Sequence, residues 1–188
     1  MTKQERVKYL MLLQEKTRRD AAKQLHTFLQ HYAWPVLQPG TKFVDNWHIH
    51  AICEHLEAVS RGEIKRLVIN LPFRMLKSTI ISQAFPAWEW IQRPHLQYLT
   101  ASYAKDVATR DAVDSRKIIE SQIYQDAWGN KFKMTSDQNV KTRYENDAKG
   151  SRVVTATDAA GTGFGGNRII IDDPVSAAEA DSEVARAT

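Results

Sequence analysis

Lys77, Ser78 and Thr79 stand at a point in the sequence where phosphate chemistry can be expected. The apolar run 67–69 predicts a strand, residues 70–76 a tight loop, and Lys77 the start of a helix. Such a helix start can place backbone N–H groups, an ammonium and a hydroxyl around a triphosphate and its magnesium. The alternative is a solvated lysine, because Leu71 and Leu76 stand where the pattern Gly-x4-Gly-Lys-[Ser/Thr] has glycines.

A pair of carboxylates, Asp172 and Asp173, ends a second apolar run that begins at Arg168. In nucleotide hydrolases the first acid at a strand end holds magnesium, and the next residue polarises the attacking water. Alternatively, Asp172 caps the following turn and Pro174 ends the strand, which leaves both acids solvated. Together with the lysine loop, the two acids favour nucleotide hydrolysis.

Composition limits the class of protein. The 188 residues suffice for one core, with 43% hydrophobic and 26% charged residues, and no apolar run approaches the roughly 20 residues of a membrane span. The charged N-terminus is unlike a signal peptide, and Cys53 alone cannot form an intrachain disulfide, so a reducing cytoplasm is expected. The net charge of +4 permits a polyanionic partner. The basic residues of the first arm are either part of such a surface or a solvated helix face: Lys3, Arg6, Lys8, Lys16, Arg18, Arg19 and Lys23.

Periodicity predicts an α/β fold with a helical N-terminal arm. A capping box at Thr2 and Glu5 begins a helix that reaches about Tyr32, and a second helix covers 47–62. A helix from Lys77 is kinked or restarted by Pro86. Further along we expect a strand over 96–101, a helix over 105–121, neighbouring strands over 140–144 and 152–156, and the strand 168–171. This order predicts a mainly parallel sheet with helices on both faces and ligands at the carboxyl ends of its strands.

Two other patterns in the sequence bear on ligand binding. The glycines of 161–166 match Gly-x-Gly-x-x-Gly, but they precede a strand instead of following one, which argues against a dinucleotide site. A loop that borders the ligand and a plain flexible connector remain the two interpretations. The histidines have no metal-ligand spacing with Cys53, so no metal is assigned to them: His26, His31, His50, His55 and His95.

Taken together, these motifs resemble the ATPase domain of the large subunit of tailed-phage terminases, the motor that packages viral DNA. That family has a phosphate loop of the form Pro-Pro-Arg-x-x-Lys-Ser, and Phe73 replaces its second proline here. The resemblance begins near Trp47, which divides the chain into a helical arm and linker (1–46) and a P-loop NTPase-like domain (47–188). Its other motifs are Gly62-Glu63-Ile64, Ser102-Tyr103-Ala104, Gly150-Ser151-Arg152, Thr162-Gly163-Phe164-Gly165 and Ile170-Ile171-Asp172-Asp173-Pro174.

The resemblance implies a magnesium-dependent ATPase. Lys77 would contact the β and γ phosphates, Arg74 would stabilise the transferring charge, Ser78 and Asp172 would hold magnesium, and Asp173 would polarise water. Trp47 and His48 stand where the family contacts adenine, although core packing of Trp47 is an alternative. The residues of the implied ATP-binding loop are Pro72, Phe73, Arg74, Met75, Leu76, Lys77, Ser78 and Thr79.

The implied partners are double-stranded DNA, the small terminase subunit, the portal protein and further copies of the chain in a ring, with no membrane. The compartment would be the cytoplasm of a bacterial host that carries the phage or prophage. The family's nuclease domain and coupling segment do not follow Thr188, so a partial core with a missing strand and no nuclease activity is expected. The alternatives are a prophage remnant that binds nucleotide or DNA without significant catalysis, and a helicase or small-molecule kinase, whose further motifs are absent.

Overall fold

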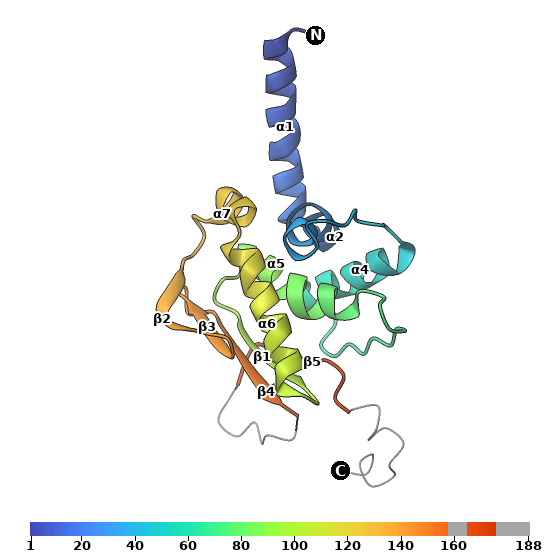
Figure 1. The fold of residues 1–188 in the computed structure, drawn as a ribbon, viewed down its shortest axis with the longest axis vertical. Coiled ribbons are helices and arrows are strands. Elements are labelled where there is room, and N and C mark those ends of the chain that lie inside the picture. The colour runs from blue at the N-terminus through green and yellow to red at the C-terminus, as the bar shows by residue number, and fades with distance from the viewer. Residues whose placement is uncertain (158–164, 176–188) are drawn as a thin grey trace.

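The computed structural model describes residues 1–157 and 165–175 (Figure 1). A five-stranded sheet is flanked by helices, which confirms the α/β class. The first half of the chain is helical, with π-helical segments η1 (Leu29–Ala33) and η2 (Thr79–Ala84). Among the described residues, no helix combines the length and the apolar character needed to cross a membrane. The helices are α1 (Lys3–Ala21), α2 (Leu25–Phe28), α3 (Trp34–Leu37), α4 (Trp47–Arg61), α5 (Phe85–Gln92), α6 (Lys105–Glu120) and α7 (Gln122–Trp128).

The sheet has the strand order β2-β3-β4-β1-β5. The strands are β1 (Gln97–Ser102), β2 (Met134–Val140), β3 (Arg143–Asn146), β4 (Ser151–Ala156) and β5 (Arg168–Ile171). β1 pairs in parallel with β4 and β5, whereas β3 pairs antiparallel with β2 and β4. The prediction of a mainly parallel sheet was therefore wrong, and the sheet is mixed. The reason is local, because short polar turns on both sides of β3 let three consecutive strands meander.

The strand predicted for residues 67–69 is not formed, and that prediction was wrong. Residues 66–70 belong to no strand. They keep the alternation of an extended chain, with Leu67 and Ile69 partly buried against the core and Val68 85% exposed. A strand needs a neighbour to pair with, and β5 ends the sheet within the described residues. Ile169 and Ile171 of β5 are 64% and 58% exposed, whereas Ile170 faces the core.

Most helix boundaries follow the local signals in the sequence. Thr2 and Glu5 form the predicted capping box at the start of α1. Gly62 ends α4 with a φ of 82°, a conformation that glycine adopts without strain. The helix that begins at Lys77 continues to Gln92, and its π-helical stretch ends just before Pro86. Proline lacks the N–H that would bond four residues back, which explains the predicted disturbance.

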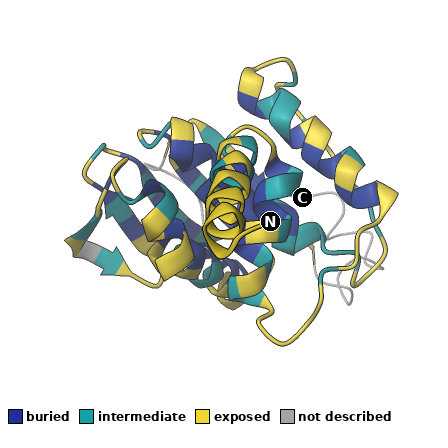
Figure 2. Cartoon of the chain, turned by 90° about the horizontal axis from the view of Figure 1, so that it is seen from above, coloured by how far each residue is buried: buried dark blue, intermediate teal, exposed yellow. Residues whose placement is uncertain are grey.

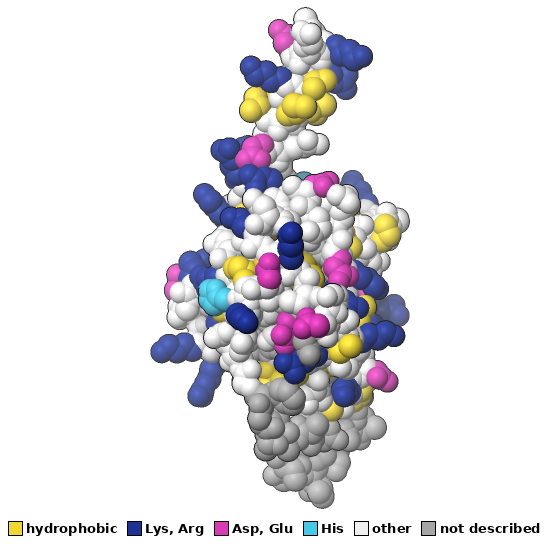
Figure 3. Space-filling model, turned by 90° about the vertical axis from the view of Figure 1, so that its left-hand side faces the viewer, with side chains coloured by type: hydrophobic (Ala, Val, Ile, Leu, Met, Phe, Trp, Pro, Cys, Tyr) yellow, Lys and Arg dark blue, Asp and Glu magenta, His cyan; other side chains and the backbone are white. Residues whose placement is uncertain are grey.

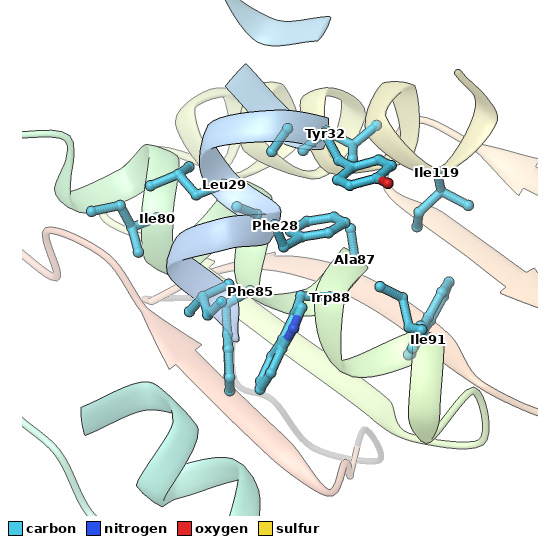
Figure 4. Packing of buried hydrophobic residues seen from close by; sticks show 14 of the residues in the cluster. Phe28, Leu29, Tyr32, Ile80, Phe85, Ala87, Trp88, Ile91 and Ile119 are labelled. Atoms are coloured by element: carbon cyan, nitrogen blue, oxygen red, sulfur yellow. The ribbon is translucent and has the colours of Figure 1, made fainter. Parts of the chain in front are cut away.

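One hydrophobic core joins the second part of the arm to the rest of the chain. Phe28 and Leu29 are fully buried, and Figure 4 shows them with Tyr32 above the helix that carries Phe85 and Trp88. Figure 2 shows the buried residues toward the middle of the body, whereas the helix beside the N-terminus is mostly exposed. Trp88 is buried in this core, and its indole donates to the carbonyl of Ala21 at 2.9 Å.

The first part of the arm projects from the body as helix α1 (Figure 1). Its apolar side chains find no core there, because six of them between Val7 and Leu13 are 45–63% exposed. Figure 3 shows lysine and arginine side chains beside this apolar surface. The base of α1 is held by Trp88, by Gln92, whose amide donates to the Ala22 carbonyl, and by Arg18, which donates to the Ala127 carbonyl of α7 at 3.3 Å.

Glu89 connects α5 to the neighbouring strands β1 and β5 from inside the core. Its carboxylate accepts two hydrogen bonds from Arg168 of β5, at 3.0 and 2.9 Å, and one from the Tyr98 hydroxyl of β1. Burial and the Glu89 charge raise the pKa of Tyr98 well above its usual value, so its hydroxyl stays a donor. Arg168 also reaches the carbonyls of Val59 and Ser60 in α4. This buried ion pair therefore fixes β5 against two helices.

Replacement of Gly150 by alanine is expected to destabilise the fold by more than about 2 kcal/mol. A Cβ there would lie 1.9 Å from the Pro94 carbonyl oxygen and 2.6 Å from Asn146 Nδ2. Chemical denaturation measures the change. Gly40→Ala is the matched control, because nothing lies within 4 Å of its Cβ and the free energy of unfolding should hardly fall. Equal stabilities of the two variants would contradict the close approach at Gly150.

Candidate functional site

The loop between the extended segment and the helix of Lys77 forms a hollow of about 350 Å³. Residues 70–79 and Asp173 line it. This volume is at the lower end of the range for small-molecule sites, roughly 300–1,000 Å³. The structure therefore brings the predicted phosphate loop and one of the two predicted acids together, although the strand expected before the loop is missing.

Two residues of the loop have the backbone conformation that glycine usually supplies. Arg74 has a φ of 64° and Leu76 a φ of 61°, whereas Met75 between them has no positive φ. Alternation of this kind turns successive N–H groups toward one side, which is how backbone nests bind anions. Leu76, which stands in place of a pattern glycine, still adopts the left-handed conformation. Such strain in non-glycine residues persists where surrounding structure enforces it, often at functional sites.

The helix start at Lys77 offers further donors to the hollow. The first N–H groups of a helix have no partner within the helix, and here the N–H of Ile80 is already bonded to the Leu76 carbonyl at 2.9 Å. The described residues provide no side-chain cap at Ser78. The N–H groups at the helix start, between Lys77 and Thr79, therefore face the side on which helices attract anions.

Lys77 lies between the two predicted acids. Its ammonium is 3.2 Å from Asp172 Oδ1 and also pairs with Asp173 Oδ1. The Lys77 side chain is 24% exposed, that of Asp172 is 9% exposed and that of Asp173 is 48% exposed. Burial by itself would lower the pKa of Lys77, but the hydrogen bond to Asp173 and the charge of Asp172 outweigh it and raise that pKa. Lys77 is therefore a charged ammonium held by carboxylates.

The end of β5 is fixed to the end of β1. The N–H of Asp172 donates to the Ala101 carbonyl at 3.0 Å, and the N–H of Tyr103 donates to the Asp173 carbonyl at 3.0 Å. Asp173 has a φ of 48°, so the backbone turns sharply at this residue. The acids thus lie at the carboxyl end of a parallel strand pair, where ligands of α/β proteins bind.

Ser82, a residue that the sequence analysis did not identify, contacts Asp172 inside the core. Its hydroxyl, fully buried, donates to Asp172 Oδ2 at 3.3 Å. Its carbonyl accepts from the buried Arg152 of β4 at 2.8 Å. Pro86 has no N–H to donate to the Ser82 carbonyl four residues earlier, and Arg152 donates to this carbonyl instead. The sequence signal was available in part, because Pro86 identifies the carbonyl four residues earlier as unpaired.

A second buried acid, Asp111 of α6, lies near the site. Gln83 donates to its Oδ1 at 2.7 Å, while its Oδ2 has no hydrogen-bond partner among the described residues. Burial raises the pKa of Asp111, and the charge of Asp172 adds to the shift. Helical spacing from the buried Ala108 and Ser115 could have placed Asp111 on the inner face of α6.

The other predicted site residues are less firmly held. Phe73 is 92% exposed and Arg74 is exposed, both on the rim of the hollow. Ser78 lines the hollow, but in the described structure the hydroxyl in contact with Asp172 belongs to Ser82. The hollow is lined by the residues of the expected ATP-binding loop: Pro72, Phe73, Arg74, Met75, Leu76, Lys77, Ser78 and Thr79.

Trp47 and His48, predicted to contact adenine, do not line this hollow. Trp47 is 78% exposed, so the alternative of core packing was wrong for it. His48 is 93% buried by contrast, and neither ring nitrogen has a hydrogen-bond partner among the described residues. Of the glycine-rich stretch, residues 161–164 lie outside the described residues.

In comparisons with family models, curated proteins and solved structures, nothing matches this chain. The functional argument therefore depends on the residues and the geometry of the site.

Asp111→Asn is expected to stabilise the protein more at pH 7 than at pH 4. A carboxyl whose pKa is raised by folding contributes most below its unfolded pKa of about 4, and this contribution is lost as the pH rises through the folded value. The neutral amide removes that loss. Urea denaturation at both pH values measures the difference. Ser115→Ala is the control, because Ser115 lies on the same buried face and does not titrate; it should change the free energy of unfolding equally at both pH values. An equal change at both pH values for Asp111→Asn would contradict the raised pKa of Asp111.

Proposed function

We propose that the chain is the ATP-binding and ATP-hydrolysing part of a motor that resembles the large terminase subunit of tailed phages and acts on double-stranded DNA. The observation that carries this proposal is the Lys77 ammonium between Asp172 and Asp173 at a helix start beside the loop hollow. A phosphate-binding cation, two strand-end carboxylates and unpaired helix N–H groups are the parts that phosphoryl transfer requires.

In this proposal Lys77 exchanges its partners when a nucleotide binds. The phosphates of ATP replace the carboxylates as partners of the Lys77 ammonium. Because this ammonium is already paired with charged groups, its further desolvation on binding costs little free energy. Asp172 is then available to a cation, and its burial and its contact with Ser82 keep it oriented. Its oxygen ligands suit Mg²⁺, which would neutralise phosphate charge. Ser78 supplies a further hydroxyl on the same loop.

Asp173 and Arg74 have the remaining roles. Asp173 has its backbone carbonyl fixed by Tyr103, while its side chain is about half exposed and reaches the hollow. It can therefore accept a hydrogen bond from a water beside the phosphates. The exposed guanidinium of Arg74 extends from a left-handed residue of the loop and offers bidentate contact to phosphate oxygens.

Double-stranded DNA is the proposed polyanionic partner. The basic side chains of α1 stand on a helix that projects from the body (Figure 3), where they can follow a phosphate backbone without reading bases. By the resemblance, a small terminase subunit, a portal protein and further copies in a ring complete the assembly, in the cytoplasm of a bacterial host.

One observation favours the second candidate function, nucleotide binding without significant turnover. Residues 66–70, which precede the loop, are not paired into the sheet. Phosphoryl transfer depends on positioning, so a loop without a strand behind it holds the reacting groups less firmly. Measured binding with slow phosphate release would support this candidate over the first.

Lys77→Ala is expected to weaken Mg-ATP binding by about 10- to 100-fold, because hydrogen bonds to charged groups contribute roughly 1.5–3 kcal/mol. Fluorescence of a labelled ATP analogue measures the affinity. Lys131→Ala, which removes an exposed lysine away from the hollow, is the matched control. Thermal unfolding establishes that both variants are folded, and unchanged affinity in a folded Lys77→Ala protein would refute the proposed phosphate contact.

Asp173→Asn and Asp172→Asn are expected to have different effects. Asp173→Asn keeps nucleotide binding and loses hydrolysis, since only the water-polarising charge is removed. Asp172→Asn also weakens the magnesium-dependent part of binding. Phosphate release with and without double-stranded DNA, and ATP affinity with and without magnesium, separate the two roles. If both variants match the parent in all four measurements, the acids do not take part in the reaction.

A further inference from the structure

We propose that His26, Asp45 and His50 form a binding site for one divalent transition metal ion, of which zinc fits the ligands best. The three side chains each offer a ligand atom, and these atoms all lie within 4.8 Å of one another. The loop hollow does not include these residues, so the proposal is independent of nucleotide binding.

The geometry centres on the Asp45 carboxylate. His26 Nε2 is 2.9 Å from Asp45 Oδ1, and His50 Nε2 is 2.9 Å from Asp45 Oδ2. The hydrogen bonds from both histidines lower the pKa of Asp45, which stays ionised. Two imidazole nitrogens and one carboxylate oxygen are a ligand set of zinc sites that keep a fourth position open, and of other transition metals with two histidines and one carboxylate.

The imidazole rings of the two histidines in this cluster are stacked on each other. The ring centroids of His26 and His50 are 3.8 Å apart, with 19° between the ring planes. Ligands of a tetrahedral zinc ion are separated by about 3.3 Å. Each histidine nitrogen would therefore move slightly away from its Asp45 oxygen, now 2.9 Å distant, and the rings would splay to admit the ion. His50 is 47% exposed at its side chain and His26 19%, which leaves His50 free to rotate.

The three residues come from separate parts of the fold. His26 belongs to α2, Asp45 lies just before Asn46, the N-cap of α4, and His50 is in the first turn of α4. Phe43 packs edge-on against His26 at 5.9 Å between ring centroids. A bound ion would therefore fix the connection between α3 and α4 to the helices α2 and α4.

The sequence assigned no metal to the histidines, because they have no metal-ligand spacing with Cys53. His26 and His50 are also distant from each other in the chain. The structure brings these two together, whereas Cys53 is buried and outside the cluster. Burial raises the pKa of the Cys53 thiol to about 12, so it is a poor metal ligand at neutral pH. His55 instead bonds the Ala51 carbonyl of its own helix at 2.7 Å.

Metal binding at this site is coupled to protons. The ion would take the place of the hydrogen-bond protons between the imidazole nitrogens and the carboxylate, and these protons move to Nδ1 or to solvent. A cluster that is only a hydrogen-bonded triad would instead keep these protons in place when zinc is added.

The test is titration of the tag-free full chain, first dialysed against a chelator, with Zn²⁺ by calorimetry and with Co²⁺ by visible absorption. We expect one equivalent to bind and the cobalt spectrum to indicate nitrogen and oxygen ligands. His50→Gln and Asp45→Asn should each weaken binding by more than about tenfold, since even outer-shell changes at metal sites have effects of that size.

His55→Gln is the matched control, because it removes a histidine of the same helix that is not in the cluster. It should leave the affinity unchanged. Circular dichroism establishes that each variant is folded, and the cobalt spectrum of the unchanged chain tests the site without any substitution. Absence of zinc and cobalt binding by the parent chain, or equal affinities of the parent and folded His50→Gln, would overturn the proposal and leave a hydrogen-bonded triad.

Discussion

Two ion pairs of opposite polarity join one helix to one strand, and the placement of the site depends on them. The helix 77–92 has Lys77 at its start and Glu89 near its end, while β5 begins with Arg168 and is followed by Asp172. Lys77 pairs with Asp172, and Glu89 pairs with Arg168. If the helix were reversed against the strand, like charges would meet at both ends. The charges therefore specify the antiparallel direction of helix and strand as well as their register.

The two pairs differ in how easily their partners can change. Glu89 is buried and satisfied by three donors, and removal of one partner from such a pair typically costs about 3–5 kcal/mol, so this contact is permanent. Lys77 and Asp173 are partly open to solvent, where a charged ligand can compete. Arg152 strengthens the same joint, because it holds the Ser82 carbonyl from β4. A fixed contact at one end of the helix thus keeps an exchangeable one in position at the other.

Local signals in the sequence predicted the parts of the fold that depend on neighbouring residues. The Thr2 capping box, Gly62, the helix over 105–121 and the strand that ends before Asp172 are all formed near the predicted positions. The run 67–69 has the composition of a strand, but strand formation requires a pairing partner that composition cannot supply. The contacts of Ser82, Asp111 and the His26 cluster join distant segments, so only the folded chain reveals them. The sequence predicted Lys77 and the two acids near the same edge of the sheet, but it did not predict that Lys77 pairs with both carboxylates.

The projecting helix α1 has a mechanical consequence. Its base is attached through Trp88 and Gln92 to α5, which continues the helix that starts at Lys77. Nineteen residues of α-helix extend about 28 Å, so a tilt of about 10° at the base displaces the far end by about 5 Å. A small rearrangement around Lys77 that tilts α1 at its base would therefore produce a larger displacement at the basic N-terminal end of α1.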